Sequence, residues 1–226
     1  MRDAVASGEF SEEALDVLVR RILNFSLRLK ERESSAEIDM EEYHADAREV
    51  AAQCMVLLKN EGILPLGNQS GKRILIAGQL AAEPNVEGSG SGYMNGYRVD
   101  EPVAEIESFA GEHGIEVSFC PGYEVSEKRP PVDMDSSETL WMEVKTEAKK
   151  ADIVLAFVGA PYGYESESYD RPHIRLPKNQ QEMLDQLAAE SKPLVIILTG
   201  GSVYDLTPWS DKADAILFAG MAGEGY

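Results

Sequence analysis

Cysteine and histidine are scarce in this sequence. The two cysteines, Cys54 and Cys120, are too few for a disulfide framework or a zinc cluster, and we expect both to be small buried hydrophobic residues. The three histidines are scattered without the spacing of metal ligands, and His44 and His113 are expected on helix surfaces. The sequence therefore predicts no metal site.

Positively charged residues are also few. Lys and Arg number 21 against 40 Asp and Glu, which gives a formal net charge of -19. Such a surface repels nucleic acid and anionic membranes, so neither is expected as a partner. No apolar run approaches the roughly 18 residues of a membrane-spanning helix. The opening MRDAVASGEF has no apolar signal-peptide core, which favours the cytoplasm but leaves the compartment open.

The sequence does contain apolar, β-branched segments that alternate with helical patterns. The predicted strands are Arg73–Gly78, Ile115–Cys120, Asp152–Val158, Leu194–Thr199 and Ala215–Ala219. The predicted helices are Ser11–Phe25, Met40–Cys54, Pro102–Ala110, Ser136–Lys150 and Pro177–Glu190. This alternation is typical of a parallel sheet with helices on both faces. The expected class is therefore α/β, a three-layer α/β/α sandwich with a mostly parallel sheet of about five strands.

A charged, serine-containing stretch, Leu29–Asp39, has the composition of a linker. We place a domain boundary there, between residues 1–39 and 40–226.

The stretch Tyr162–Gln180 is the main candidate site. It reads YGYESESYDRPHIRLPKNQ and follows a predicted buried strand, where α/β proteins usually carry their sites. Glu165, Glu167, Asp170 and Arg171 lie within seven positions. Neighbouring charges can move a carboxyl pKa in either direction, as acid/base chemistry requires. On charge alone, a solvated surface loop with a local Asp170–Arg171 pair explains the same residues.

The same stretch resembles the signature of glycoside hydrolase family 3, the β-glucosidase family. That signature is Glu-x-Glu-Gly-x-Asp-Arg, three variable positions, Leu-Pro and a Gln. The matching residues are Glu165, Glu167, Asp170, Arg171, Leu176, Pro177 and Gln180, and Ser168 stands where the family usually has Gly. The run Met55–Leu66 is similar to the start of the family's second domain, and we expect a short buried strand and a turn there. Ala4–Leu23 resembles the end of the family's catalytic barrel domain.

The resemblance implies that the chain contains parts of two domains with different roles. Residues 1–39 would be the end of the barrel, and residues 40–226 an incomplete C-terminal α/β-sandwich domain. Family members hydrolyse terminal β-linked sugars with retention, with an Asp nucleophile on the barrel, which this chain lacks. The resemblance implies that Glu167 is the acid/base, that Glu165 is the second candidate, and that Asp170 and Arg171 hold the loop in shape.

A glycine-rich segment, Val86–Gly96, follows the first predicted parallel strand. Its glycines begin ten residues after Gly78 and open no helix, and no Lys-Ser or Lys-Thr follows, so we exclude dinucleotide and phosphate loops and expect no cofactor. By the family resemblance, Gly88–Gly92 borders the sugar site. Ser89 and Ser91, with Asp170 and Arg171, are the predicted sugar-binding residues.

The favoured interpretation is a β-glucosidase-like hydrolase domain that is inactive by itself. Its expected partners are a carbohydrate (a β-glucoside or related glycan) and the barrel domain. On the face that meets the barrel, Tyr162, Tyr164 and Tyr169 are expected to be open to water. Two alternatives stay open: a non-catalytic sugar-binding or scaffold domain, and a flavodoxin- or Rossmann-like nucleotide-binding protein.

Overall fold

The computed structural model describes residues 1–30, 38–67, 69–125, 138–168 and 170–225. The chain divides into two compact units, Met1–Asp39 and Met40–Tyr226. In none of the described helices do length and apolar character together suffice to cross a membrane.

Unit 1 contains two helices, α1 (Arg2–Ala6) and α2 (Glu12–Lys30), and neither of these described helices has a buried residue. The backbone N–H of Ala14 donates to the Ser11 hydroxyl at 3.1 Å, so Ser11 caps α2. Helix α2 continues five residues beyond the predicted end at Phe25. Its last turns are rich in Leu, Arg and Lys, which are strong helix formers, so the linker was predicted to begin too early.

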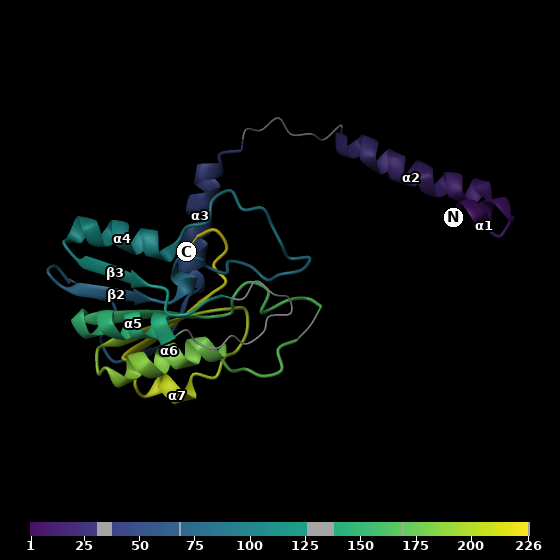
Figure 1. Ribbon diagram of the computed structural model, residues 1–226. Helices are drawn as coiled ribbons and strands as arrows, with labels where there is room; N and C mark the ends of the chain where they lie inside the picture. The colour runs from purple at the N-terminus through teal and green to yellow at the C-terminus, as the bar shows by residue number, and fades with distance from the viewer. Residues whose placement is uncertain (31–37, 68, 126–137, 169, 226) are drawn as a thin grey trace. The chain divides into compact units, whose positions relative to one another are not determined.

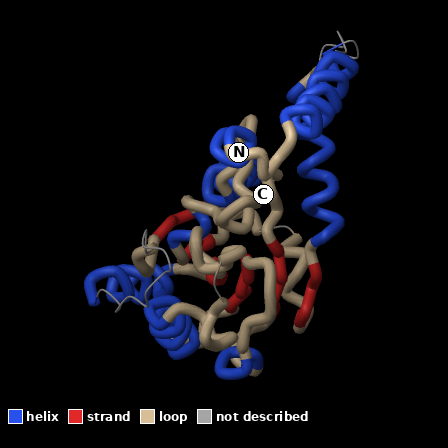
Figure 2. The backbone as a smooth tube through the Cα atoms, turned by 90° about the vertical axis from the view of Figure 1, so that its right-hand side faces the viewer, coloured by secondary structure: helices blue, strands red, loops and turns tan. Residues whose placement is uncertain are grey.

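Unit 2 is built on one six-stranded sheet with strand order β1-β6-β5-β4-β2-β3 (Figure 1, Figure 2). The strands are β1 (Val56–Asn60), β2 (Arg73–Ala77), β3 (Glu116–Cys120), β4 (Ile153–Gly159), β5 (Leu194–Thr199) and β6 (Ala215–Gly220). Strands β2 to β6 pair in parallel, and β1 pairs antiparallel with β6. The predicted mostly parallel sheet is confirmed.

Helices cover both faces of this sheet. They are α3 (Met40–Cys54), α4 (Pro102–His113), α5 (Glu138–Lys150), α6 (Lys178–Ala189) and α7 (Thr207–Ser210), with a 3-10 turn η1 (Gln79–Ala81). Figure 1 shows α4 on one face and α5, α6 and α7 on the other. Every residue of β4 and β5 is buried, as expected for central parallel strands with both faces covered. The predicted three-layer sandwich is therefore confirmed, although the predicted helix start at Ser136 lies outside the described residues.

The prediction for the run Met55–Leu66 was wrong in one respect. Strand β1 is not buried: it forms the sheet edge, and Val56, Leu57 and Leu58 are each about half exposed. The Lys59 ammonium donates to the carbonyls of Ser210 and Ala213, and so ties this edge to the end of α7. An apolar run of this kind fits a central or an edge strand equally well, so composition could not separate the two.

The sequence pattern predicts that Tyr43, Ala47, Val50, Ala51 and Cys54 share one side of helix α3, and only part of that side faces inward. Its buried residues are His44 and Ala51, whereas Tyr43, Val50 and Cys54 are exposed. The predictions of a surface His44 and a buried Cys54 were therefore wrong, while Cys120 is buried as expected. The pattern considered apolar residues alone, and a buried histidine shifts the inward stripe by one residue around the helix.

Strand order also determines where a site can form. β2 and β4 are neighbours, and the connection after β2 leads to β3 on one side while the connection after β4 leads to β5 on the other. Open α/β sheets bind ligands at such a switch point, outside the carboxyl ends of the strands. The loops after β2 and β4 are the two that carry the predicted site residues.

Candidate active site

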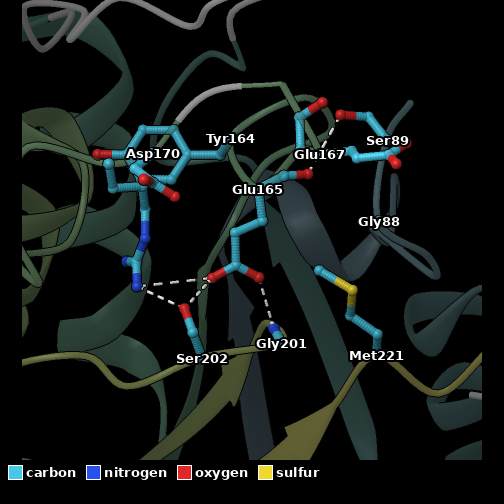
Figure 3. Close-up of a pocket in the computed structure, with 11 residues that line it drawn as sticks. Gly88, Ser89, Tyr164, Glu165, Glu167, Asp170, Gly201, Ser202 and Met221 are labelled. Atoms are coloured by element: carbon cyan, nitrogen blue, oxygen red, sulfur yellow. Dashed lines mark hydrogen bonds and ion pairs between the residues drawn. The ribbon is translucent and has the colours of Figure 1, made fainter. Parts of the chain in front are cut away.

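Four loops at the carboxyl edge of the sheet surround a hollow of about 370 Å³ (Figure 3). The residues that line it are Gly88 and Ser89 after β2, Tyr164, Glu165, Ser166, Glu167, Asp170 and Arg171 after β4, Gly201 and Ser202 after β5, and Met221 after β6. The structure thus brings together five of the six predicted site residues on this wall. The sixth, Ser91, contacts Glu167 directly.

The end of β4 is fixed by a glycine and a glutamine. Gly159 has φ +143°, and a Cβ there would lie 1.8 Å from the Thr199 carbonyl oxygen, so no other residue fits. The side chain of Gln180, fully buried, accepts from the Gly159 N–H at 2.8 Å and donates to its carbonyl at 3.1 Å. The last residue of the predicted signature therefore anchors the strand from which the site loop departs.

Glu165 is surrounded by donors. One carboxylate oxygen accepts from the Gly201 N–H at 2.6 Å. The other accepts from the hydroxyls of Ser202 and Tyr204 and lies 3.6 Å from an Arg171 nitrogen. Figure 3 shows the side chain of Glu165 directed toward Gly201 and Ser202 and away from Glu167. The side chain is only 15% exposed, so this carboxylate is held firmly in place.

Arg171 joins the loops after β4 and β5. Its guanidinium lies 4.2 Å from the ring centre of Tyr204 and 5.9 Å from that of Tyr164, and it donates to the carbonyl of Val203 at 3.0 Å. In the described part of the chain its ion pair is with Glu165, and the predicted pair with Asp170 does not form. Burial, and then the neighbouring carboxylate of Glu165, raise the pKa of Tyr204 above its usual range.

The exposure predicted for the tyrosines of this loop is wrong for Tyr164. Its side chain is buried as part of the hydrophobic core, and its ring centre lies 5.9 Å from the Arg171 guanidinium. Tyr162 is half-buried, and Tyr169 lies outside the described residues.

Glu167 has a different environment. It is exposed, and one carboxylate oxygen accepts from the hydroxyl and the backbone N–H of Ser91. These two hydrogen bonds hold the pKa of Glu167 below its ordinary value. Gly90, at φ +94°, allows this approach, since a Cβ there would lie 3.3 Å from the Glu167 Cβ. Of the glycines predicted to border the site, Gly90 is thus needed where the two loops meet, whereas a Cβ at Gly88 would meet nothing within 4 Å.

Ser89, Ser168 and Asp170 complete the loop contacts. The hydroxyl and N–H of Ser89 both donate to the Glu165 carbonyl at 3.1 Å. Among the described non-glycine residues, positive φ occurs at Ser191 alone, so Ser168 fits without strain at the position where the resembling signature has glycine. Asp170 is exposed and lines the hollow.

Several residues of this wall were not found from the sequence. Gly201, Ser202 and Tyr204 follow β5, and Met221 follows β6. The signal that could have found them is the position of GGSVY directly after a predicted strand, because parallel strands end at one edge. In the ranges that the structure describes, no three His, Cys, Asp or Glu side chains are grouped to hold a metal ion.

Comparison with known sequences decides the family. The family model described as the Glycosyl hydrolase family 3 C-terminal domain matches residues 55–225. The chain belongs to glycoside hydrolase family 3. Among curated relatives, the Thermostable beta-glucosidase B of Acetivibrio thermocellus is 35% identical over 98% of this chain and 28% of its own length. The Exo-alpha-(1->6)-L-arabinopyranosidase of Bifidobacterium breve is 29% identical over 98% of this chain and 29% of its own length.

A solved structure of the family has the same fold. The crystal structure of a GH3 beta-glucosidase from Bifidobacterium adolescentis superposes with a TM-score of 0.75 at 28% identity, over 98% of this chain and 31% of that one. The chain thus spans less than a third of the length of these relatives. The resemblance to family 3 and the α/β class are confirmed, and the nucleotide-binding alternative finds no support.

Proposed function

We propose that this chain is part of a retaining glycoside hydrolase in which Glu167 is the acid/base. The observation that carries the proposal is the contrast between two glutamates on one loop. An acid/base must exchange a proton with the glycosidic oxygen, so it needs a carboxyl oxygen that substrate can reach. Glu167 is exposed, and its hydrogen bonds within the described chain, both from Ser91, are to one oxygen. Both oxygens of Glu165 are occupied by donors.

The electrostatics of the loop support the same choice. Gly201, Ser202 and Tyr204 donate to the two oxygens of the Glu165 carboxylate, and Arg171 lies beside it. Such a group anchors the loop and leaves no oxygen open to a substrate. The pKa of Glu167 is lowered by Ser91 alone, and a sugar and a protein wall closing over the exposed carboxyl would remove water and raise that pKa.

The remaining parts of the enzyme are proposed from the family resemblance. Residues 1–39 are the end of a preceding barrel domain, and that barrel carries the carboxylate nucleophile. Retention with two carboxyl groups requires a separation of about 5–5.5 Å, so the barrel must cover the hollow beside Glu167. This arrangement accounts for a hollow whose described lining includes the exposed carboxylates Glu167 and Asp170.

The proposed substrate is a terminal β-linked sugar, a β-glucoside or a related glycan. Ser89, Ser91, Asp170 and Arg171 remain the proposed sugar-contacting residues. Asp170 is the clearest of these, because it is exposed on the hollow and has no ion pair or hydrogen bond within the described chain.

The test is Glu167→Gln in the full-length parent enzyme. With a poor leaving group, such as an alkyl glucoside, we expect kcat/KM to fall by about 10²–10⁴-fold, because the leaving oxygen receives no proton. With a dinitrophenyl glycoside, which leaves without protonation, the first step should be far less affected. Glu124→Gln, a carboxyl change outside the hollow, is the matched control. An unchanged rate with the alkyl glucoside would rule out the assignment.

A further inference from the structure

A polar cluster lies where the segment Gly223–Gly225 meets helix α3. The glycine loop, Val86–Gly96, separates this cluster from Glu167. Asp100 and His44 are among its members, and their side chains are only 6% and 1% exposed. The His44 Nε2 lies 3.0 Å from an Asp100 carboxylate oxygen, to which Arg48 also donates at 3.0 Å. Buried charges of this kind are retained only where partners compensate for the loss of water. None of these residues lines the hollow.

Glu224 is the residue of this cluster that contacts the glycine loop. Its side chain accepts from the N–H of Tyr97, directly after the loop. Its carbonyl accepts from the Asp100 N–H at 3.1 Å. At the other end of the loop, the neighbouring Gly223 N–H donates to the Val86 carbonyl at 3.1 Å. One short segment after β6 therefore fixes both ends of a loop that follows β2.

His44 lies between Asp100 and that segment. Its Nδ1 lies 3.6 Å from the second carboxylate oxygen of Glu224, so the two ring nitrogens face two different carboxylates. A Cβ at Gly225 would lie 2.6 Å from the Cα of Arg48, so backbone packs directly on the helix at this point. We call Glu224, His44 and Asp100 the clasp.

The middle of the same loop carries Ser91. Its hydroxyl and N–H are the hydrogen-bond donors to Glu167. The loop is exposed from Gly90 to Val99, so little packing of its own fixes the position of Ser91. Its position depends on the fixed ends of the loop, on the Met94 N–H that donates to the Glu87 carboxylate at 2.9 Å, and on the contact of Ser89 with the Glu165 carbonyl.

We propose that Glu224 is a positioning residue for the acid/base: with His44 and Asp100 it closes the glycine loop and so keeps Ser91 hydrogen-bonded to Glu167. The inference rests on the proposed role of Glu167, but its test requires no catalysis.

The experiment follows the Glu167 carboxyl in the 226-residue chain by NMR titration with ¹³C-labelled glutamate. Ser91→Ala removes the hydroxyl that favours the ionised form and keeps the backbone N–H, so the midpoint of Glu167 should move to higher pH. Glu224→Ala should move it in the same direction. Because both changes act through the contact between Ser91 and Glu167, the shift of the double variant should be smaller than the sum of the two single shifts. His44→Phe, which keeps a ring of similar size, should give a smaller shift of the same sign.

Two changes on α4 serve as matched controls. Glu112→Ala and His113→Phe remove the same groups at exposed positions outside the clasp, and neither should alter the titration of Glu167. A role of the clasp in stability alone would lower the unfolding midpoint and leave the Glu167 titration in place.

Three outcomes would overturn the proposal. The first is a Glu224→Ala protein that titrates as wild type at Glu167 while Ser91→Ala shifts. The second is a Ser91→Ala protein without any shift. The third is loss of a dispersed spectrum in both clasp variants, which would make the clasp a requirement of folding. Failure of the proposed function is separate, since it appears as an unchanged rate of Glu167→Gln in the parent enzyme.

Discussion

Glu165 and Glu167 are two positions apart and have opposite surroundings. Glu165 and Arg171 are 15% and 13% exposed, and the carboxylate accepts from Gly201, Ser202 and Tyr204. Hydrogen bonds to a charged group contribute more than neutral ones when they are removed from water. The contrast predicts that one glutamate contributes to stability and the other, if the proposal is right, to chemistry.

Glu165→Gln should lower the free energy of unfolding by about 2 kcal/mol, because it removes the charge that Arg171 and the hydroxyls face. Glu167→Gln should change it by less than about 0.5 kcal/mol, since the group is exposed. Urea unfolding of both variants with matched slopes measures the difference. Equal midpoints for the two variants would contradict this account of Glu165.

The contact between Ser91 and Glu167 predicts how the activity of the parent enzyme depends on pH. Its hydrogen bonds stabilise the ionised form of Glu167 and so lower the pKa of that carboxyl. In Ser91→Ala the pKa is higher, so the carboxyl keeps its proton to a higher pH. If Glu167 is the general acid of the full-length parent, the alkaline limb of its kcat/KM profile should move to higher pH. Ser70→Ala, remote from the hollow, serves as control, and a limb that moves to lower pH would contradict the sign.

At the scale of elements, the edge strand β1 depends on one lysine. The Lys59 ammonium donates to the Ser210 carbonyl at 2.8 Å and the Ala213 carbonyl at 2.6 Å, and it pairs with Glu61 at 2.8 Å. Carbonyls at the end of α7 have no partner within the helix, and a cation satisfies them. The contact joins the edge strand β1 to the end of α7 and to the turn that precedes β6.

Lys59→Met keeps the aliphatic length and removes the donors. We expect a loss of about 1.5 kcal/mol in the free energy of unfolding, the value of one to two hydrogen bonds to a partly exposed charged group. Lys212→Met, an exposed lysine on the same side, should cost less than about 0.5 kcal/mol. Denaturant melts compare the two, and equal costs would show that the carbonyl contacts contribute nothing.

The elements that could be predicted are those determined by local composition. β4 and β5 lie within one residue of their predicted bounds, because a buried parallel strand needs a continuous apolar run. The edge position of β1 could not be predicted, since it depends on which strand pairs with it. The inward stripe of α3 was missed because His44 counts as polar until Asp100 and Glu224 are seen beside it.

In the site, too, the residues that share one stretch of sequence could be predicted. Glu165, Glu167 and Arg171 lie on one loop and share one sequence pattern. Ser202, Tyr204 and Glu224 reach the site or its clasp from loops after other strands, and only the strand order brings them there. Spacing along the chain carries no information about such contacts.

At the scale of the molecule, the described residues line the hollow from one edge of the sheet. Its lining comes from four loops at the carboxyl edge of one sheet, and its carboxylates belong to a single stretch of seven residues. Double displacement requires a second carboxylate across the sugar from the acid, held within a fraction of an ångström. Glu165 cannot supply it, because both its oxygens are occupied and it lies on the same loop as Glu167.

The 226-residue chain alone should therefore not hydrolyse glycosides. Asp170 is three residues from Glu167 on the same loop, so it too approaches a sugar from the same side. A hollow that the described residues line from one edge of the sheet also admits water and binds sugar weakly, so any glucose affinity should be millimolar or weaker. Pure chain incubated with nitrophenyl β-glucoside should release no nitrophenol above the buffer rate, while the full-length parent serves as the positive control. Steady release that Glu167→Ala abolishes would show that this chain contains a complete active site, with a nucleophile among its own residues.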